Sequence, residues 1–296
     1  MAYKSGFVSV VGRPNVGKST LTNRFAGEKI SIISSKPQTT RNTIRTIITT
    51  EDSQVIFIDT PGMHKPKSKL GEYMVGIARN TLNEVDIVLF LVEAGEPEPG
   101  PGDLFIIEQL KSVKTPVFLI INKIDLVKKE QLLKVIENYT NLMDFAEVIP
   151  VSALNGEGTD IVMKEIRNYL PEGPKYFPED MITDQPEKMI AAELIREKIL
   201  ELVQDEVPHG TGVEIILFRE REEKNLVDIE ANIYCEKETH KGILIGKDGV
   251  MLKNIGMLAR KEIENILGAK VYLKLWVKVK KDWRNNEYML KLLGYK

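Results

Sequence analysis

A segment near the N-terminus has the residue types and spacing needed to hold a polyphosphate. It follows the pattern G-x-x-x-x-G-K-[ST] and consists of Gly12, Arg13, Pro14, Asn15, Val16, Gly17, Lys18 and Ser19, with Thr20 next in the chain. Glycines allow a tight loop whose backbone N–H groups surround phosphate oxygens at the start of a helix. Lys18 is predicted to reach the β- and γ-phosphates, and the Ser19 hydroxyl to bind Mg²⁺. The alternative interpretation is a glycine-rich strand-to-helix turn without a ligand.

A second segment at the end of an apolar run could complete the phosphate end of such a site. It consists of Asp59, Thr60, Pro61 and Gly62. Asp59 is placed to support Mg²⁺ through a water molecule, and the N–H of Gly62 can meet the γ-phosphate. Both segments therefore predict binding of a nucleoside triphosphate with Mg²⁺.

Two later segments predict which base is bound. In Asn122-Lys123-Ile124-Asp125, the carboxylate of Asp125 can accept hydrogen bonds from guanine N1–H and the 2-amino group, neither of which adenine presents. Lys123 is expected beside the base, and Asn122 is expected to tie this segment to the phosphate loop. A further segment is Ser152, Ala153 and Leu154, where a backbone amide could meet guanine O6. The predicted ligand is GTP rather than ATP.

The predicted secondary structure brings these segments to one edge of a sheet. The predicted strands are residues 7–11, 44–50, 55–59, 87–92, 117–122 and 148–151, and the predicted helices are 18–27, 72–83, 102–112, 129–140 and 159–169. Several strands are nearly continuous apolar runs, which is typical of a parallel sheet covered on both faces. We therefore predict a doubly wound α/β domain over residues 1–172, with its ligand site at the carboxyl ends of the strands.

Prolines then interrupt the pattern and predict a linker at residues 173–186. A smaller α+β domain over residues 187–296 is expected to follow. Its predicted elements are a helix at 188–203, strands at 213–221 and 226–235, a helix at 250–267 and a strand at 270–279. The turn Glu222-Glu223-Lys224-Asn225 is expected to join the first two of these strands as a hairpin.

The second domain carries a short loop and a basic region that could bind RNA. The loop is Gly246, Lys247, Asp248 and Gly249, at the start of an amphipathic helix. Residues 181–240 carry a net charge of −8, whereas residues 241–296 carry +8. Lys274, Lys278 and Lys280 are expected on one face of a strand, among Tyr272, Trp276 and Trp283, aromatic residues that could stack on bases. The alternative is a protein-interaction or purely structural module.

Taken together, these motifs resemble those of known families. The first domain is similar to the small G-domain GTPases, and the second resembles a bacterial-type KH domain, in which a G-x-x-G loop clamps about four single-stranded nucleotides. Gln38-Thr39-Thr40-Arg41 resembles the first, mobile switch of bacterial Era-like GTPases. That resemblance favours Thr40 as a Mg²⁺ ligand in the GTP state, although the spacing leaves Thr39 open.

The whole chain resembles the Era-like GTPases. This resemblance implies Mg²⁺-dependent GTP hydrolysis, yielding GDP, and binding to the single-stranded 3′ region of small-subunit ribosomal RNA. It also implies a role in maturation of the small ribosomal subunit and peripheral association with the inner membrane.

Catalysis lacks one expected group, because Ras-like enzymes use a glutamine after the D-x-x-G motif to orient water. Met63 stands there instead and cannot make the strong hydrogen bonds that position water, so unstimulated turnover should be slow. His64 could act or simply be solvated. Asn15 resembles the asparagine that helps bind K⁺ in related GTPases lacking this glutamine, or it only shapes the loop. Lys18, Thr40 and Asn15 are therefore the candidate catalytic residues.

Composition excludes several other classes of protein. The sequence has a single cysteine, Cys235, which cannot form an intramolecular disulfide and fits a reducing cytoplasm. It has no apolar run near the ~20 residues of a membrane-spanning helix, and no signal peptide is expected. Two competing classes remain: a metabolic or transport P-loop enzyme, which does not explain Asn122–Asp125, and an RNA-binding scaffold that uses GTP only structurally.

Overall fold

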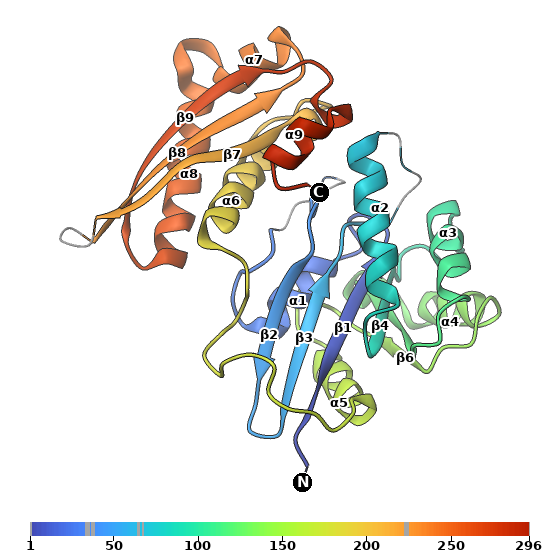
Figure 1. The fold of residues 1–296 in the computed structure, drawn as a ribbon. Helices are drawn as coiled ribbons and strands as arrows, with labels where there is room; N and C mark the ends of the chain where they lie inside the picture. The colour runs from blue at the N-terminus through green and yellow to red at the C-terminus, as the bar shows by residue number, and fades with distance from the viewer. Residues whose placement is uncertain are drawn as a thin grey trace. The chain divides into compact units, whose positions relative to one another are not determined.

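The computed structural model describes residues 2–32, 36, 39–63, 66, 68–221 and 225–295. The chain divides into two compact units. The first extends to Asp184 without residues 68–70, and the second comprises residues 68–70 together with Gln185–Lys296. Each unit is described by itself below (Figure 1).

A six-stranded sheet forms the centre of the first unit. Its strands are β1 (Lys4–Gly12), β2 (Ile44–Thr49), β3 (Ser53–Asp59), β4 (Ile87–Glu93), β5 (Val117–Asn122) and β6 (Glu147–Pro150), in the spatial order β2-β3-β1-β4-β5-β6. All neighbouring strands are parallel except the pair β2 and β3. Only residues 50–52 separate those two strands, which suits a hairpin and is too short for a parallel crossover. The predicted doubly wound, mostly parallel sheet is confirmed.

Helices cover both faces of this sheet and create two apolar cores. They are α1 (Lys18–Ala26), α2 (Lys69–Leu82), α3 (Pro101–Leu110), α4 (Lys129–Thr140) and α5 (Thr159–Tyr169). Leu21 of α1 and Ile166 of α5 pack with strand residues in one core. Ala78 of α2, Ile106 of α3 and Val135 of α4 belong to the other. The strands whose carboxyl ends carry the predicted ligand site are thus packed on both faces.

A strap, residues 171–184, is held on the first unit by Gln54 of β3. This glutamine is fully buried. Its Oε1 accepts hydrogen bonds from the N–H groups of Tyr176 (2.7 Å) and Phe177 (3.0 Å), and its Nε2 donates to the carbonyl of Phe177 (2.9 Å). One side chain thus satisfies several backbone groups of a segment that has no regular secondary structure of its own.

The strap ends on β2, the edge strand of the sheet. The N–H of Ile47 donates to the carbonyl of Ile182 at 2.9 Å, and the Arg45 guanidinium pairs with Asp184 at 2.6 Å. An edge strand has backbone groups without a neighbouring strand, and the strap provides a partner for one of them. Most of the linker predicted from the prolines, residues 173–184, is therefore part of the first unit.

The second unit contains a three-stranded sheet with helices against it. Its strands are β7 (Gly212–Arg221), β8 (Leu226–Cys235) and β9 (Lys270–Val279), and its helices are α6 (Glu187–Leu202), α7 (Glu238–Ile245), α8 (Val250–Leu267) and α9 (Glu287–Leu292). The five elements predicted for this domain are confirmed, as is the antiparallel pairing of β7 with β8. The predicted turn residues 222–224 lie outside the described residues. In the described part of the chain, no helix is both long and apolar enough to cross a membrane.

Candidate nucleotide site and nucleic-acid groove

The phosphate loop runs from the end of β1 to the start of α1, as its glycines predict. Its backbone has positive φ at Asn15 (68°) and at Gly17 (100°), which caps the N-terminus of α1. A Cβ added at Gly17 would lie 2.2 Å from the Nδ2 of Asn122. Glycine is therefore required at this position by both its conformation and its close neighbour.

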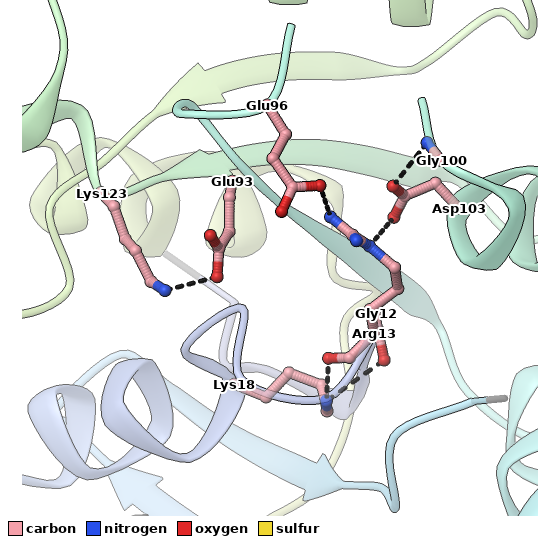
Figure 2. A network of polar contacts seen from close by, with 8 residues as sticks. All are labelled: Gly12, Arg13, Lys18, Glu93, Glu96, Gly100, Asp103 and Lys123. Atoms are coloured by element: carbon pink, nitrogen blue, oxygen red, sulfur yellow. Dashed lines mark hydrogen bonds and ion pairs between the residues drawn. The ribbon is translucent and has the colours of Figure 1, made fainter. Parts of the chain in front are cut away.

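Backbone carbonyl groups of this loop hold the side chain of Lys18 in place. Its Nζ donates hydrogen bonds to the carbonyl oxygens of Gly12 (3.2 Å) and Arg13 (2.8 Å) (Figure 2). The side chain is only 7% exposed, and burial lowers the pKa of Lys18 to about 8, an effect that the nearby Asp59 carboxylate opposes. Phosphate oxygens would stabilise the charged form that burial disfavours.

The three predicted Mg²⁺ ligands converge beside Lys18. The Ser19 Oγ lies 2.7 Å from the Oδ2 of Asp59 and 3.2 Å from the Oγ1 of Thr40. Asp59 is fully buried, which raises the pKa of its carboxyl, and its Oδ1 has no hydrogen-bond partner within the described residues. Hydroxyl and carboxylate oxygens are ligands that suit Mg²⁺, and the buried carboxylate oxygen calls for a cation or donor. These residues fit the metal.

The two threonines that the sequence leaves open as Mg²⁺ ligands have different hydrogen-bond partners in the structure. The Oγ1 of Thr39 donates to the carbonyl of Lys36 at 2.6 Å, whereas Thr40 presents its hydroxyl to Ser19. Arg41, expected in a mobile switch, is fully buried. The neighbouring Gln38 lies outside the described residues.

A cleft opens over the phosphate loop. Its lining includes Asn15, Lys18, Ser19, Thr40 and Gly62. A Cβ added at Gly62 would lie 3.0 Å from the backbone nitrogen of Pro14, so the two phosphate-binding segments approach closely.

The residues around Gly62 have structural roles as well. The hydroxyl of Thr60 donates to the carbonyl of Val10 at 2.8 Å, and Pro61 is buried. Met63 is fully buried and belongs to an apolar core. His64, the other candidate after the D-x-x-G motif, is outside the described residues.

Asn122 joins the base-binding segments to the phosphate loop, as expected. Its Nδ2 donates to the carbonyl of Val16 at 2.8 Å, and its Oδ1 accepts from the N–H of Ala153 at 2.9 Å. Asp125 is exposed on the short 3₁₀ helix that follows β5, and the side chain of Leu154 is also exposed. The predicted tie is confirmed, and one side chain connects three loops of the site.

The G-x-x-G loop connects α7 to α8 in the second unit. Gly246 ends α7 with φ 72° and Gly249 caps α8 with φ 76°, while the side chains of Lys247 and Asp248 are exposed. Next to it, a groove is lined by Gly249, Leu252, Lys253, Gly256, Met257, Arg260, Leu273 and Leu275. A groove therefore lies beside the predicted G-x-x-G loop. Lys253, Met257 and Arg260 were missed, although their spacing of four and three residues along a helix places them on one face.

The predicted strand lysines do not line this groove. Lys274 and Lys278 are exposed on β9 together with Trp276, whereas Leu273 and Leu275 line the groove. Side chains alternate along a strand, so these lysines lie on the opposite face of the sheet. Lys280 is exposed just beyond the end of β9.

The suggestion that Trp283 could stack on bases is wrong. Trp283 is fully buried, and its Nε1 donates to the carbonyl of Gly210 at 2.8 Å. The strand ends at Val279, so the alternation that exposes Trp276 does not extend to Trp283.

Two family models match the chain, one described as a 50S ribosome-binding GTPase over residues 7–123 and one as a KH domain over residues 206–284. The GTPase Era of Ruminiclostridium cellulolyticum is 63% identical over 296 residues, which cover all of this chain and 99% of that protein. The GTPase Era of Alkaliphilus metalliredigens is 58% identical over 295 residues, covering all of both chains. The chain belongs to the Era family of GTPases.

Solved Era structures share the fold over nearly the whole length. A crystal structure of Era in complex with MgGDPNP and nucleotides 1506–1542 of 16S ribosomal RNA is 43% identical, with a TM-score of 0.95 and 99% of each chain covered. An Aquifex aeolicus Era variant bound to GDP and AlF₄⁻ is also 43% identical, with a TM-score of 0.94 and the same coverage. The predicted fold class is therefore confirmed for both domains.

In this Era-family GTPase, the side chain of Arg13 turns from the phosphate loop towards α3. Its Nε donates to the Oδ1 of Asp103 at 2.9 Å, and its Nη2 donates to Glu96 at 2.6 Å (Figure 2). Asp103 is fully buried, and burial raises its pKa while the Arg13 guanidinium opposes this shift. Arg13 thus belongs to the loop through its backbone, and its side chain has a separate partner.

Further contacts to the base-binding segments carry no motif in the sequence. Arg24 of α1 donates from Nε to the carbonyl of Ala153 at 3.2 Å and also hydrogen-bonds the carbonyl of Leu154. Glu93 forms an ion pair with Lys123 (Figure 2). Both contacts join residues far apart in the sequence, and nothing in their spacing would have identified them.

Proposed function

We propose that this GTPase hydrolyses GTP to GDP and phosphate on its first unit and binds the single-stranded 3′ region of small-subunit ribosomal RNA through its second unit. In this way it assists maturation of the small ribosomal subunit. The observation that carries this proposal is that the chain combines the Ser19, Thr40 and Asp59 oxygens beside a P-loop lysine with a groove beside a G-x-x-G loop. The Era relative with bound MgGDPNP and 16S ribosomal RNA supports both halves.

At the phosphate end, Ser19, Thr40 and Asp59 are the proposed Mg²⁺ ligands, Asp59 acting through a water molecule. When bound, Mg²⁺ would neutralise negative charge on the phosphate oxygens. Lys18 would exchange its backbone carbonyl partners for the β- and γ-phosphates, and the N–H of Gly62 would meet the γ-phosphate.

Catalysis in this proposal proceeds without a water-positioning glutamine. Met63 is buried and takes the place of that glutamine, so other groups must assist the attack of water and stabilise the developing charge. Asn15 is exposed and lines the phosphate cleft, which suits a ligand of K⁺. Its positive φ also agrees with the alternative that Asn15 only shapes the loop, because asparagine tolerates this conformation.

At the base end, Asp125 is the proposed partner of guanine N1–H and the 2-amino group, with Lys123 beside the base. A backbone amide of Ser152, Ala153 or Leu154 is the proposed donor to guanine O6. The hydrogen bonds of Asn122 to the phosphate loop and to Ala153 support this assignment, because they hold both base-binding segments at the site.

In the second unit, the proposed RNA-binding residues are Gly246, Lys247, Asp248 and Gly249, together with the groove. Exposed Lys253 and Arg260 can pair with phosphates, and exposed Met257 can contact a splayed base. Lys274, Lys278 and Lys280 would contact a part of the RNA outside the groove.

A cytoplasmic location is proposed, with peripheral association at the cytoplasmic face of the inner membrane as a second location. The single thiol, Cys235, is buried, and burial raises its pKa to about 11, as suits an unreactive thiol in a reducing compartment. The charge of +8 over residues 241–296 supports attraction to an anionic surface.

GTP turnover measured with and without a 3′-terminal small-subunit RNA oligomer tests the proposed function. We expect slow hydrolysis by the protein alone and measurable binding of the oligomer over a scrambled oligomer of the same composition. An absence of turnover in both conditions would favour a scaffold that uses GTP structurally. Equal binding of the two oligomers would contradict the RNA assignment.

A further inference from the structure

The end of β4 carries a carboxylate that belongs to none of the GTPase motifs. Glu93 is the last residue of β4 and pairs in register with Asn122 of β5. The following amide, the N–H of Ala94, donates to the carbonyl of Asn122 at 2.8 Å. Glu93 forms its ion pair with Lys123, the residue directly after Asn122 (Figure 2). The parallel ladder thus fixes a negative charge next to the lysine of the base-binding segment.

The side chain of Lys123 is the group that this ion pair would restrain. Its backbone has φ 66°, and its side chain is about one-third exposed at the point where β5 ends. A lysine side chain is long and flexible, and ordering it at the moment of ligand binding would cost conformational entropy. An ion pair that exists before the ligand arrives removes part of that cost.

We propose that Glu93 is a positioning residue for guanine binding. It holds the Lys123 ammonium so that the aliphatic part of the lysine lies along the base. This inference rests on the proposed function, in which Lys123 lies beside guanine. Glu93 stands on a strand rather than in a loop, so the position it imposes is rigid.

Two effects of Glu93 on nucleotide affinity have opposite signs. As a negative charge it repels the phosphates, and removing it would tighten binding. Salt screens this repulsion, so it should weaken as the ionic strength is raised. As an anchor for Lys123 it favours binding, and its loss should weaken affinity by about three- to tenfold, the size of one side-chain hydrogen bond. The sign of the change therefore distinguishes the two roles.

The same segment provides a matched control. Glu98 is exposed, lies five residues after Glu93, and forms no ion pair or hydrogen bond within the described residues. Glu98→Gln removes the same charge from the loop that follows β4, without touching Lys123. Glu96 is less suitable because it pairs with Arg13 of the phosphate loop.

The test measures Kd for GTP, GDP and GMP on the full chain carrying Glu93→Gln, Glu98→Gln, Lys123→Ala or Glu93→Gln with Lys123→Ala. We expect Glu93→Gln to weaken all three nucleotides by the same factor and Glu98→Gln to change each by less than about twofold. In the Lys123→Ala background, Glu93→Gln should add no further loss. KM for GTP should rise with kcat unchanged, and the thermal midpoint should hardly move because a partly exposed ion pair adds little stability.

Several results would overturn the inference. Unchanged or tighter binding by Glu93→Gln would show that Glu93 acts only as a charge. A loss that grows with the number of phosphates, or one that persists without Lys123, would place its effect elsewhere. If the unmodified protein bound GTP and ATP equally, the proposed function would fail together with this inference. A clear GTP preference with an unaffected Glu93→Gln variant would remove the inference alone.

Discussion

Asn15 combines two properties that point to different roles. Its backbone has φ 68°, and its side chain is exposed at the phosphate cleft. If the carboxamide helps hold K⁺, GTP hydrolysis should be faster in K⁺ than in Na⁺ at equal ionic strength, by about tenfold for 1.4 kcal/mol of transition-state stabilisation. Asn15→Gly should abolish the difference, because glycine keeps the loop conformation without the carboxamide. Equal rates of the unmodified protein in both salts, or a K⁺ preference retained by Asn15→Gly, would leave Asn15 with a role in loop shape only.

Asp125 determines the choice of base through one carboxylate. Asp125→Asn replaces an acceptor with an amide that can donate to the 2-oxo group of xanthine, so GTP binding should weaken and XTP binding should improve. A hydrogen bond to a charged group contributes roughly 1.5–3 kcal/mol, which corresponds to a change of about tenfold to a hundredfold. A competition titration of GTP against XTP measures this preference. A variant that still prefers GTP by the original factor would contradict the assignment of Asp125.

At the scale of elements, the strap depends on Gln54. Gln54→Ala removes the side chain that hydrogen-bonds the backbone of Tyr176 and Phe177. Leaving such groups without partners costs about 1–3 kcal/mol. The free energy of unfolding of the first unit, measured by urea denaturation, should therefore fall by that amount. Limited proteolysis should cut residues 171–184 faster.

The chain supplies a control variant and a way to separate the units. Glu179→Gln breaks an exposed ion pair with Lys175 in the same strap and should change stability by less than about 1 kcal/mol. Both tryptophans, Trp276 and Trp283, belong to the second unit, so tryptophan fluorescence reports unfolding of that unit. A loss of circular dichroism that precedes the change in fluorescence therefore reports unfolding of the first unit. Equal stability of Gln54→Ala and Glu179→Gln would show that the strap is not anchored through Gln54.

At the scale of the whole molecule, we expect binding of the nucleotide and binding of the RNA to be energetically coupled through the chain that joins the two units. Thr40, a proposed Mg²⁺ ligand, lies four residues before β2, and β2 holds the strap at Ile182 and Asp184. Asp184 directly precedes the second unit. A change at Thr40 between the GTP and GDP states therefore acts on the strand that holds the last residues of the first unit.

We expect the GTP state to bind a 3′-terminal RNA oligomer more tightly than the GDP state. Couplings of this kind are typically about 5–150-fold, and RNA must then tighten GTP binding by the same factor. The measurement titrates one oligomer against protein bound to GDP or to a non-hydrolysable GTP analogue at fixed salt. Replacing Lys247 and Asp248 should lower RNA affinity while leaving GTP affinity without RNA intact. Equal affinities in both nucleotide states would mean that the two units share a chain without energetic coupling.

The sequence by itself determined the features that depend on local patterns. Strands such as β4 and β5 are nearly continuous apolar runs, and the phosphate loop needs glycines at set positions, so both could be predicted from neighbouring residues alone. The convergence of Ser19 and Asp59 followed as well, because the carboxyl ends of adjacent parallel strands meet at one edge of a sheet.

Only the tertiary structure decided the features that depend on contacts between distant segments. Thr39 and Thr40 carry the same hydroxyl, and only the position of Ser19 separates them. Alternation along β9 predicted that Lys274 and Lys278 share a face, but the packing of α8 against the other face decided that they lie away from the groove. The pairing of Glu93 with Lys123 arises from the register of β4 against β5, which neither segment encodes by itself.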